Sequence, residues 1–140
     1  MTFPFLNRPV LKKITVGVGN ASGEQARLML EGLCRELPEL LMTYVAELSS
    51  GTVLASYTSH PDYNPNKVSL RNAKIFAILA KPLATHPWLG GPIHDLTAVL
   101  ADQFHHLSLC NEGKWYCFVA VLTTDANLGV VKGIVRRYAT

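Results

Sequence analysis

The sequence predicts a single α/β domain of the α+β kind, in which helices pack on an antiparallel sheet. The chain has 140 residues, the ordinary size of one domain with its own core. Helix-type and strand-type apolar periodicity alternate along it, and the later strands are joined too tightly for parallel crossovers. With 49% apolar and 16% charged residues, the composition excludes a disordered chain.

The first part of the chain is predicted to be an N-terminal arm, residues 1–22, followed by the domain at 23–140. Within the arm, the segment ITVGVG at 14–19 has the alternation of a short extra strand, weakened by its glycines. The following segment has apolar residues at helical spacing up to Pro38, and Ser22 with Gln25 fits a capping box. A helix is therefore expected from about residue 22 to 37.

The middle of the chain predicts a hairpin and a long helix. Residues 41–57 alternate in strand fashion around a Ser49-Ser50-Gly51 turn. A helix is then expected from 67 to about 85, capped by Asn66 and kinked or ended by Pro82. Its apolar residues spread over two faces, so we expect it to contact more than one surface.

The last part predicts three strands and a closing helix. Strands are expected at 96–102, 104–110 and 115–122, and the last of these, WYCFVAVL, is apolar on both sides. Such a strand belongs in the middle of a sheet covered on both faces. The final helix is expected to begin at a cap formed by Asp125 or Asn127.

Composition narrows the compartment and the class of partner. The net charge of +3 is low for a nucleic-acid reader, so we predict no nucleic-acid partner. Three cysteines, each in an apolar stretch, indicate buried thiols of a reducing compartment rather than a disulfide framework. The sequence shows neither a signal peptide nor an apolar run long enough for membrane insertion, which predicts a cytoplasmic protein.

No constellation of side chains indicates catalysis, so we predict no catalytic, cofactor-binding or metal-binding residues. His105 and His106 are adjacent in a strand and must point to opposite faces. The one competing pattern is a glycine turn between a strand and a helix, formed by Gly17, Gly19 and Gly23, which suits a dinucleotide pyrophosphate. A hairpin follows where that fold needs a parallel strand ending in an acid. A nucleotide-binding enzyme remains the alternative function.

Two surface features suggest an interaction role. One side of the 67–85 helix carries the four cations Lys67, Arg71, Lys74 and Lys81. They form either a solvated helix face or a docking surface for an acidic partner. Trp88, beside a Gly-Gly-Pro loop, fits either the edge of the core or an interface.

The element order helix, hairpin, helix, three strands, helix resembles the Roadblock/LC7 family over about residues 23–138. The specific pieces are the turn and strand SGTVLAS and the cap ANLG between the last strand and the last helix. The turn departs from the family, which has an acid-Gly pair where this chain has Ser-Ser-Gly. The resemblance implies a five-stranded antiparallel sheet in profilin-like layering, with the middle helix on one face and the terminal helices on the other.

The family resemblance also implies a function, since such proteins regulate or scaffold small Ras-like GTPases or serve as motor adaptors, without catalytic residues. We therefore expect a non-enzymatic dimer, either a homodimer or a heterodimer with a paralogue, that binds a small GTPase and needs no cofactor. The four cations would contact the partner. The dimer interface would lie on the middle helix and the strand 96–102, at Leu70, Ala73, Ala77, Ala80, Leu96, Ala98 and Leu100. A peptide-binding structural adaptor is the other alternative.

Overall fold

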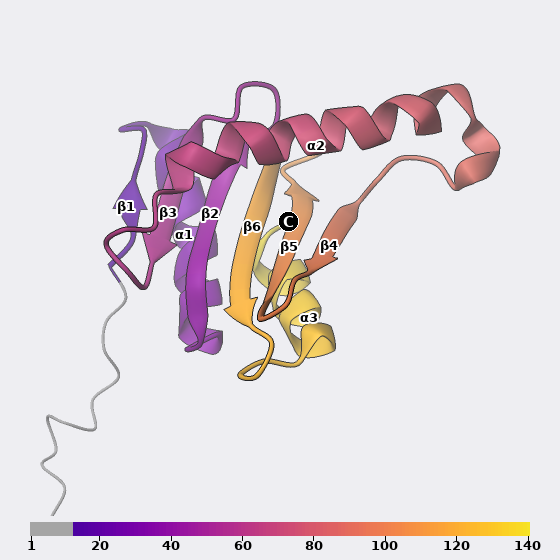
Figure 1. The fold of residues 1–140 in the computed structure, drawn as a ribbon. Coiled ribbons are helices and arrows are strands. Elements are labelled where there is room, and N and C mark those ends of the chain that lie inside the picture. Colours follow the sequence, from indigo (N-terminus) through magenta and orange to yellow (C-terminus); the bar gives the residue numbers. More distant parts are fainter. Residues whose placement is uncertain (1–12) are drawn as a thin grey trace, which may run out of the picture.

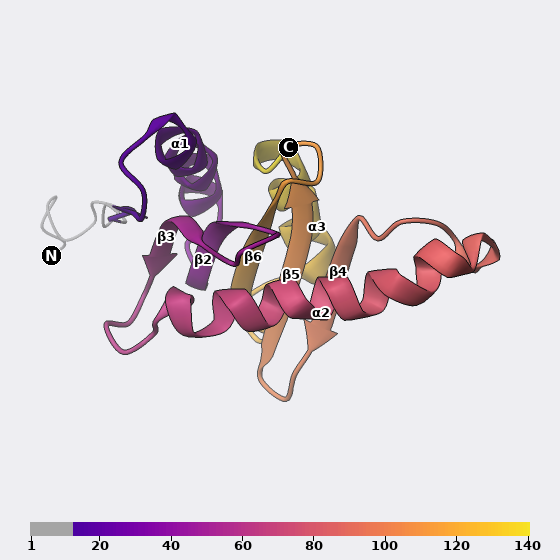
Figure 2. The ribbon, with the colours of Figure 1, turned by 90° about the horizontal axis from the view of Figure 1, so that it is seen from above.

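The computed structural model describes residues 13–140 as a six-stranded antiparallel sheet with helices on both faces (Figure 1). The strands follow the order β1-β3-β2-β6-β5-β4. Helices α1 and α3 lie on one face and α2 on the other (Figure 2), as predicted. The elements are β1 (Thr15–Val16), α1 (Ala21–Glu36), β2 (Leu40–Glu47), β3 (Val53–Thr58), α2 (Pro65–Thr85), the 3₁₀ turn η2 (Pro87–Leu89), β4 (Asp95–Val99), β5 (Gln103–Cys110), β6 (Trp115–Leu122) and α3 (Leu128–Tyr138).

The sixth strand is β1, which the family pattern of five strands does not include. Thr15 lies opposite Ser56 of β3, and the backbone N–H of Gly17 donates to the carbonyl of Leu54 at 2.8 Å. A Cβ on Gly17 would overlap the carbonyl oxygen of Val53, so only glycine allows this close approach. Residues 1–12 of the predicted arm lie outside the described residues, and the domain boundary after residue 22 stays a prediction.

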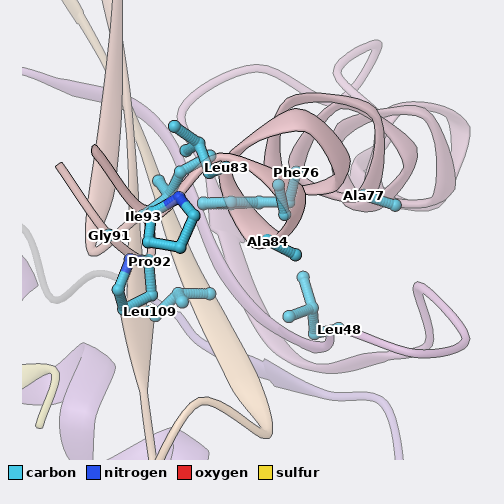
Figure 3. A pocket seen from close by; sticks show the side chains of 11 residues that line it. Leu48, Phe76, Ala77, Leu83, Ala84, Gly91, Pro92, Ile93 and Leu109 are labelled. Atoms are coloured by element: carbon cyan, nitrogen blue, oxygen red, sulfur yellow. The ribbon is translucent and has the colours of Figure 1, made fainter. Parts of the chain in front are cut away.

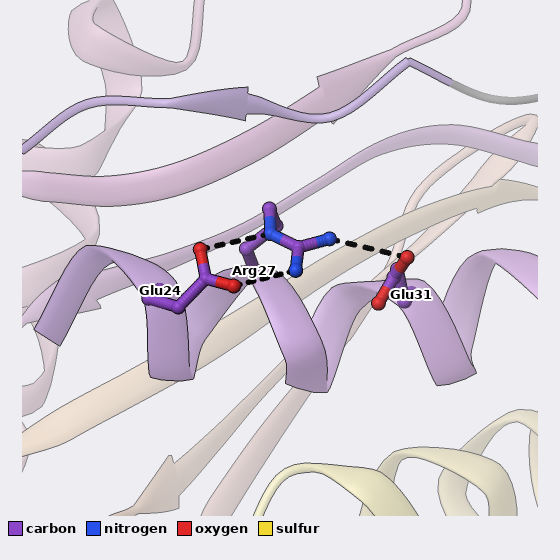
Figure 4. Close-up of polar contacts among 3 residues, drawn as sticks. All are labelled: Glu24, Arg27 and Glu31. Carbon is purple, nitrogen blue, oxygen red and sulfur yellow. Dashed lines mark hydrogen bonds and ion pairs between the residues drawn. The ribbon is translucent and has the colours of Figure 1, made fainter. Parts of the chain in front are cut away.

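Helix α1 starts earlier than the sequence predicted, because a different residue caps it. Asn20 is the N-cap, and its side-chain oxygen accepts from the backbone N–H of Gly23 at 3.1 Å. The predicted capping box of Ser22 and Gln25 is therefore wrong. On the exposed side of α1, Arg27 pairs with Glu24 at 2.6 Å and with Glu31 at 3.1 Å (Figure 4). Exposed pairs of this kind contribute only tenths of a kcal/mol each.

Strand β6 lies at the centre of the sheet, between β2 and β5, as its two-sided apolar pattern predicted. Every residue of β6 except Leu122 is buried. Its side chains alternate between two cores: Cys117, Val119 and Val121 pack beneath α1 and α3, and Tyr116, Phe118 and Ala120 face α2. The three cysteines are buried, and Cys110 and Cys117 form no disulfide with each other.

Helix α2 is held at its first turn and passes Pro82 without ending. Its cap is Asn64, whose side chain accepts from the backbone N–H of Asn66 at 3.0 Å, so the predicted cap at Asn66 is wrong by two residues. Pro65 then occupies the first helical position, where proline is favoured. Pro82 lacks an N–H and leaves one helical hydrogen bond unmade, but the helix continues to Thr85.

The remaining boundaries differ by a few residues from the sequence expectations. Strand β4 ends at Val99, so Leu100 lies in the turn to β5 rather than in the predicted strand. The side chain of Asn127 caps α3 by accepting from the backbone N–H of Val130 at 3.2 Å, which confirms one of the two predicted caps. Among residues 13–140, no helix combines the length and apolar character that a membrane span needs.

Candidate partner-binding surface

Helix α2 is fixed to the sheet by a chain of buried hydrogen bonds. The side-chain amide of Asn72 donates to the hydroxyl of Tyr44 at 2.8 Å, and the hydroxyl of Tyr116 donates to the carbonyl of Ser69 at 2.5 Å. The two tyrosine oxygens are 2.8 Å apart. Because Tyr116 uses its proton toward Ser69, Tyr44 is the donor between the two rings. This series of hydrogen bonds therefore links α2 to β2, β2 to β6, and β6 back to α2.

Both tyrosines keep their protons at neutral pH. Burial raises the pKa of Tyr44 to about 12 and also raises the pKa of Tyr116. The ring of Tyr44 stacks on Phe118 at a centroid distance of 5.0 Å, which fixes its orientation. This network was not predicted from the sequence. The available signal was Asn72, a polar residue at a helical position flanked by buried Ser69 and Phe76.

The C-terminal half of α2 leaves the sheet. All buried residues of this helix fall between Pro65 and Phe76, and every later residue is exposed or partly exposed. Figures 1 and 2 show this half projecting past β4. We call residues 77–85 the overhang. Ile78, with 69% of its surface exposed, is its most exposed large apolar side chain. The overhang thus presents an apolar surface that this chain does not cover among its described residues.

A groove of about 450 Å³ runs along one flank of α2 (Figure 3). Ala77 and Ala84 of the helix lie on one side of it, and Pro92 and Ile93 of the connection to β4 lie on the other. Leu48 and Leu109 contribute from the sheet, and no charged side chain lines the groove. The groove is therefore an apolar surface open on one side.

A smaller cavity of about 130 Å³ lies on the other flank of α2, and we call it the Phe118 cavity. Its wall includes Val68 and Arg71 from the helix, and His105 stands over Phe118 with its ring edge-on at 5.2 Å. His105 Nε2 lies 2.8 Å from the side-chain oxygen of Gln103, so in the neutral ring this nitrogen is the donor. Burial, and then the charge of Arg71, lower the pKa of His105.

Strand β4 forms the edge of the sheet next to the overhang. Among the described residues it pairs with β5 alone, so its other edge has unpaired backbone groups. Ala98, Val99 and Leu100 are exposed, and Val99 has 67% of its surface exposed. An apolar edge of this kind is a template for another strand.

The four predicted partner-contacting cations lie together on the side of α2 that faces away from the sheet. Lys67, Arg71, Lys74 and Lys81 are all exposed, and among residues 13–140 no carboxylate forms an ion pair with them. At 100° per residue they share this side with Ile78, while the buried Ser69 and Phe76 face the sheet. We call this side of α2 the docking face, and within the described residues its positive charge is not compensated.

The predicted interface residues divide into three groups. Ala73 is only 5% exposed and belongs to the core beneath α2, so a partner cannot reach it, and that assignment is corrected. Ala77 and Ala80 line the groove, and Leu70 lies against Gly51 of the β2–β3 turn. Leu96 and Ala98 sit on the edge strand and Leu100 just beyond it. For these six residues the interface role stays a prediction.

In the glycine turn that suggested a nucleotide site, Gly17 and Gly23 each allow a close backbone approach, whereas Gly19 lies in open space. All pairings in the sheet are antiparallel, and Gly23 lies in the first turn of α1, where a Cβ would overlap the carbonyl oxygen of Val18. His105 and His106 face opposite sides, since His106 bonds Thr97 at 2.9 Å. Within the described part of the chain, no three His, Cys, Asp or Glu residues are grouped as metal ligands.

Several solved structures superimpose on most of the chain. MglB of Myxococcus xanthus matches with a TM-score of 0.72 and 9% identity over 87% of both chains. The gliding protein MglB from Thermus thermophilus matches at 0.68 with 18% identity, over 89% of this chain and 90% of that one. A Roadblock/LC7 domain from Streptomyces avermitilis matches at 0.66 with 13% identity, over 84% and 90%. The chain has the Roadblock/LC7 fold.

This result confirms the resemblance inferred from the order of the elements and from the ANLG cap. At such low identities the likeness is one of fold, and residue roles do not transfer with it. Neither a protein-family model nor a curated protein matches the sequence. Relative to the five strands expected of the Roadblock/LC7 fold, β1 extends the sheet at the side opposite β4.

Proposed function

We propose that the chain is a non-enzymatic, dimeric regulator or scaffold that binds a small Ras-like GTPase. The observation that carries the proposal is the outward face of α2, where four exposed cations surround an exposed isoleucine on a helix that extends past its own sheet. Proteins of the Roadblock/LC7 fold act on small GTPases, and that association brings the partner class to this chain as an analogy of fold. The four cations, which form no ion pair within the described part of the chain, supply independent support.

The proposed dimer is supported by two surfaces on the same side of the molecule, an edge strand and an exposed apolar helix segment. Among residues 13–140 nothing pairs with the outer edge of β4, and the overhang beside it exposes Ile78 and Leu79. Pairing two copies of β4 satisfies both edges and gives the self-complementary contact of a two-fold dimer. An MglB structure is described as having a tetrameric arrangement, so assembly is compatible with this fold.

The charge of the docking face sets the kind of partner surface that fits it. Four like charges along one helix repel each other and favour an acidic surface, which speeds encounter and fixes orientation more than it adds affinity. Ile78 lies among the four cations of the docking face and offers an apolar contact at its centre. The proposed contact thus combines a charged field with one apolar anchor.

Charge reversal on the docking face tests the proposal. The double change Arg71→Glu and Lys74→Glu is expected to weaken binding of co-encoded small GTPases at least about tenfold, measured by pull-down and titration at low salt. The matched control is Lys132→Glu with Arg136→Glu, which reverses the same number of charges on α3, at the opposite face. Equal weakening by both doubles would mean that net charge, rather than this face, governs binding. Unchanged binding in the α2 double would place the contact elsewhere.

The alternative functions give different results in direct binding. A nucleotide-binding enzyme acting through Gly17, Gly19 and Gly23 would take up NAD(P) or GTP in equilibrium dialysis, whereas we expect uptake of neither. A peptide-binding adaptor would leave GTP hydrolysis and exchange by the partner unchanged. Hydrolysis and exchange assays on whichever GTPase binds therefore separate a regulator from a tether.

A further inference from the structure

The chain that follows the overhang forms an exposed turn, residues 86–91, which we call the tip. Figures 1 and 2 show it at the far end of α2, beyond β4 and away from the sheet. Trp88 has 78% of its surface exposed, the largest fraction among the big apolar side chains of the described residues, and Leu89 has 46%. Of the two interpretations of Trp88 that the sequence allowed, the edge of the core is therefore excluded.

Hydrogen bonds to the end of α2 give the tip a defined shape. The backbone N–H of His86 donates to the carbonyl of Pro82 at 2.9 Å, and His86 Nδ1 lies 2.9 Å from the hydroxyl of Thr85. The ring of Trp88 stands edge-on to the ring of His86 at a centroid distance of 5.9 Å. Gly90 then turns the chain back with a φ of +115°, a conformation that favours glycine. Trp88 is thus displayed by an ordered turn rather than by a frayed helix end.

The segment that carries the tip has charges of one sign. Between Asp62 and Asp95 the sequence contains no Asp or Glu, whereas it contains the four cations of the docking face. Lys81 is the cation nearest to the tip, one helical turn or roughly 6 Å before the end of α2. Asp95 is followed on β4 by Leu96, which faces α2, so the Asp95 side chain points to the other face of the sheet. Residues 63–94 therefore combine four positive charges with an exposed apolar tip.

We propose that the tip is a peripheral membrane contact, with Trp88 and Leu89 in the interface of an anionic lipid surface and Lys81 among its headgroups. Tryptophan is favoured at this level because its ring is apolar and its N–H is polar. Cations are attracted to an anionic leaflet within about a Debye length. Such a contact lies in the interface and needs no membrane-spanning helix. The inference goes beyond the proposed function, because it gives the chain a second kind of partner.

The shape and composition of the tip favour a lipid surface over a protein as its partner. The tip projects from the molecule, and neither Trp88 nor Leu89 lines the groove or the Phe118 cavity. A bilayer accepts a projecting apolar turn without a complementary pocket, whereas a protein must provide one. Apart from His86, the Trp88 indole is the only hydrogen-bonding side chain of the tip, and it has a single donor. This set of side chains suits an interface without specific polar contacts.

Binding to vesicles tests the charge of the contact. We expect the full chain to co-sediment at low salt with phosphatidylcholine vesicles containing about 30% phosphatidylglycerol, and to bind phosphatidylcholine alone at least about tenfold more weakly. Lys81→Gln should weaken binding to the anionic vesicles about fivefold, the effect of one cation near such a surface. Lys132→Gln on α3 removes the same charge on the opposite face of the sheet and is the matched control. Equal weakening by both variants would show that net charge attracts the protein, and would overturn the proposal.

Removal of the apolar side chains tests the tip itself. The double change Trp88→Ser and Leu89→Ser should lower binding to the anionic vesicles at least about tenfold, because it removes the apolar surface that enters the interface. Leu28→Ser on α1, where 56% of the side chain is exposed, is the control and should bind like the wild type. All three positions are exposed, so the variants should keep the folded state, as followed by circular dichroism. Unchanged vesicle binding by the double variant would overturn the proposal.

Trp88 also reports on its own surroundings, because Trp115, the other tryptophan, is buried. Without lipid, acrylamide should quench the emission of Trp88. With anionic vesicles, we expect the emission to shift to shorter wavelength and acrylamide quenching to fall. Bound protein without this shift would place the contact elsewhere, and a Trp88 shielded from acrylamide in the free protein would show that an assembly covers it. Either result would overturn the proposal.

The vesicle measurements need no GTPase, so they stand apart from the proposed function. The tip double variant is expected to keep binding to whichever GTPase the wild type binds. Loss of GTPase binding in this variant, with vesicle binding retained, would assign the tip to a protein partner and overturn the lipid contact alone. A wild type that binds anionic vesicles through the tip but binds no GTPase would refute the proposed function and leave the lipid contact in place.

Discussion

The hydroxyl of Tyr116 is the group that ties α2 to the centre of the sheet. It donates to the carbonyl of Ser69 and accepts from Tyr44, and all three residues are buried. Tyr116→Phe keeps the ring and removes both hydrogen bonds, so we expect a loss of about 1–3 kcal/mol in the free energy of unfolding, measured in urea. Tyr63→Phe, at a residue that is 39% exposed, serves as the control and should change it by less than about 0.5 kcal/mol. Equal effects would show that the network does not hold the helix.

The same residues show the limit of sequence reasoning at this scale. Caps depend on which of several nearby Asn, Ser or Asp side chains reaches a free N–H, and that is settled by the backbone entering the helix. The caps Asn20 and Asn64 each lie two residues before the predicted positions, while Asn127 was among the predicted caps. The Tyr44–Tyr116 contact joins two strands distant in sequence, so periodicity along either strand carries no sign of it.

At the scale of the element, the first half of α2 packs on the sheet and the second half has no buried residue. Residues 69–76 include the buried anchors, whereas residues 77–85 include no buried residue and contain Pro82, whose missing N–H weakens the helix by about 3 kcal/mol relative to alanine. We expect amide hydrogen exchange to be at least about tenfold faster in 77–85 than in 69–76 when the protein is dilute and monomeric. Pro82→Ala should slow exchange in the overhang and leave 69–76 unchanged. Uniform exchange along the helix would contradict this division.

Helix α2 also shows why the interface could be predicted only in part. Its apolar residues on two faces indicated more than one contact surface, and in the structure two of its flanks are lined by apolar side chains. The sequence could not show that the buried part of α2 ends at Phe76, because that depends on how the helix crosses the strands. For this reason Ala73 was assigned to the surface and proves to be core, while Ile75 and Leu79 were not assigned and prove to be exposed.

At the scale of the whole molecule, the layers and the central strand could be predicted because the spacing of apolar residues along the sequence reflects which faces of each element are buried. The order of elements, the position of β6 and the separation of α2 from α1 and α3 were all predicted correctly. The pairing of β1 was weakly signalled, since its strand has only two residues and the following Gly17 serves a close backbone approach rather than strand alternation. The extension of α2 past β4 is a property of the assembled sheet, and no local pattern in the sequence indicates it.

The exposed edge of β4 and the overhang of α2 lead us to predict that folding and dimerisation are coupled. If the overhang and β4 are completed by a second copy, the native state is a dimer and the melting temperature depends on protein concentration. Each tenfold increase in concentration adds about 1.4 kcal/mol to the stability of the dimer, which for a molecule of this size corresponds to roughly 2–4 °C. Ala98 lies on the α2 face of β4, and Val99, the next residue, points to the other face. We expect this rise between about 1 and 100 µM for the wild type and for Val99→Trp, followed by circular dichroism at pH 7.5. Ala98→Trp should melt at a lower temperature that does not change with protein concentration, because its folded form is the monomer. A wild type whose melting temperature stays constant over that range would show that the β4 edge and the overhang are stable without a second copy.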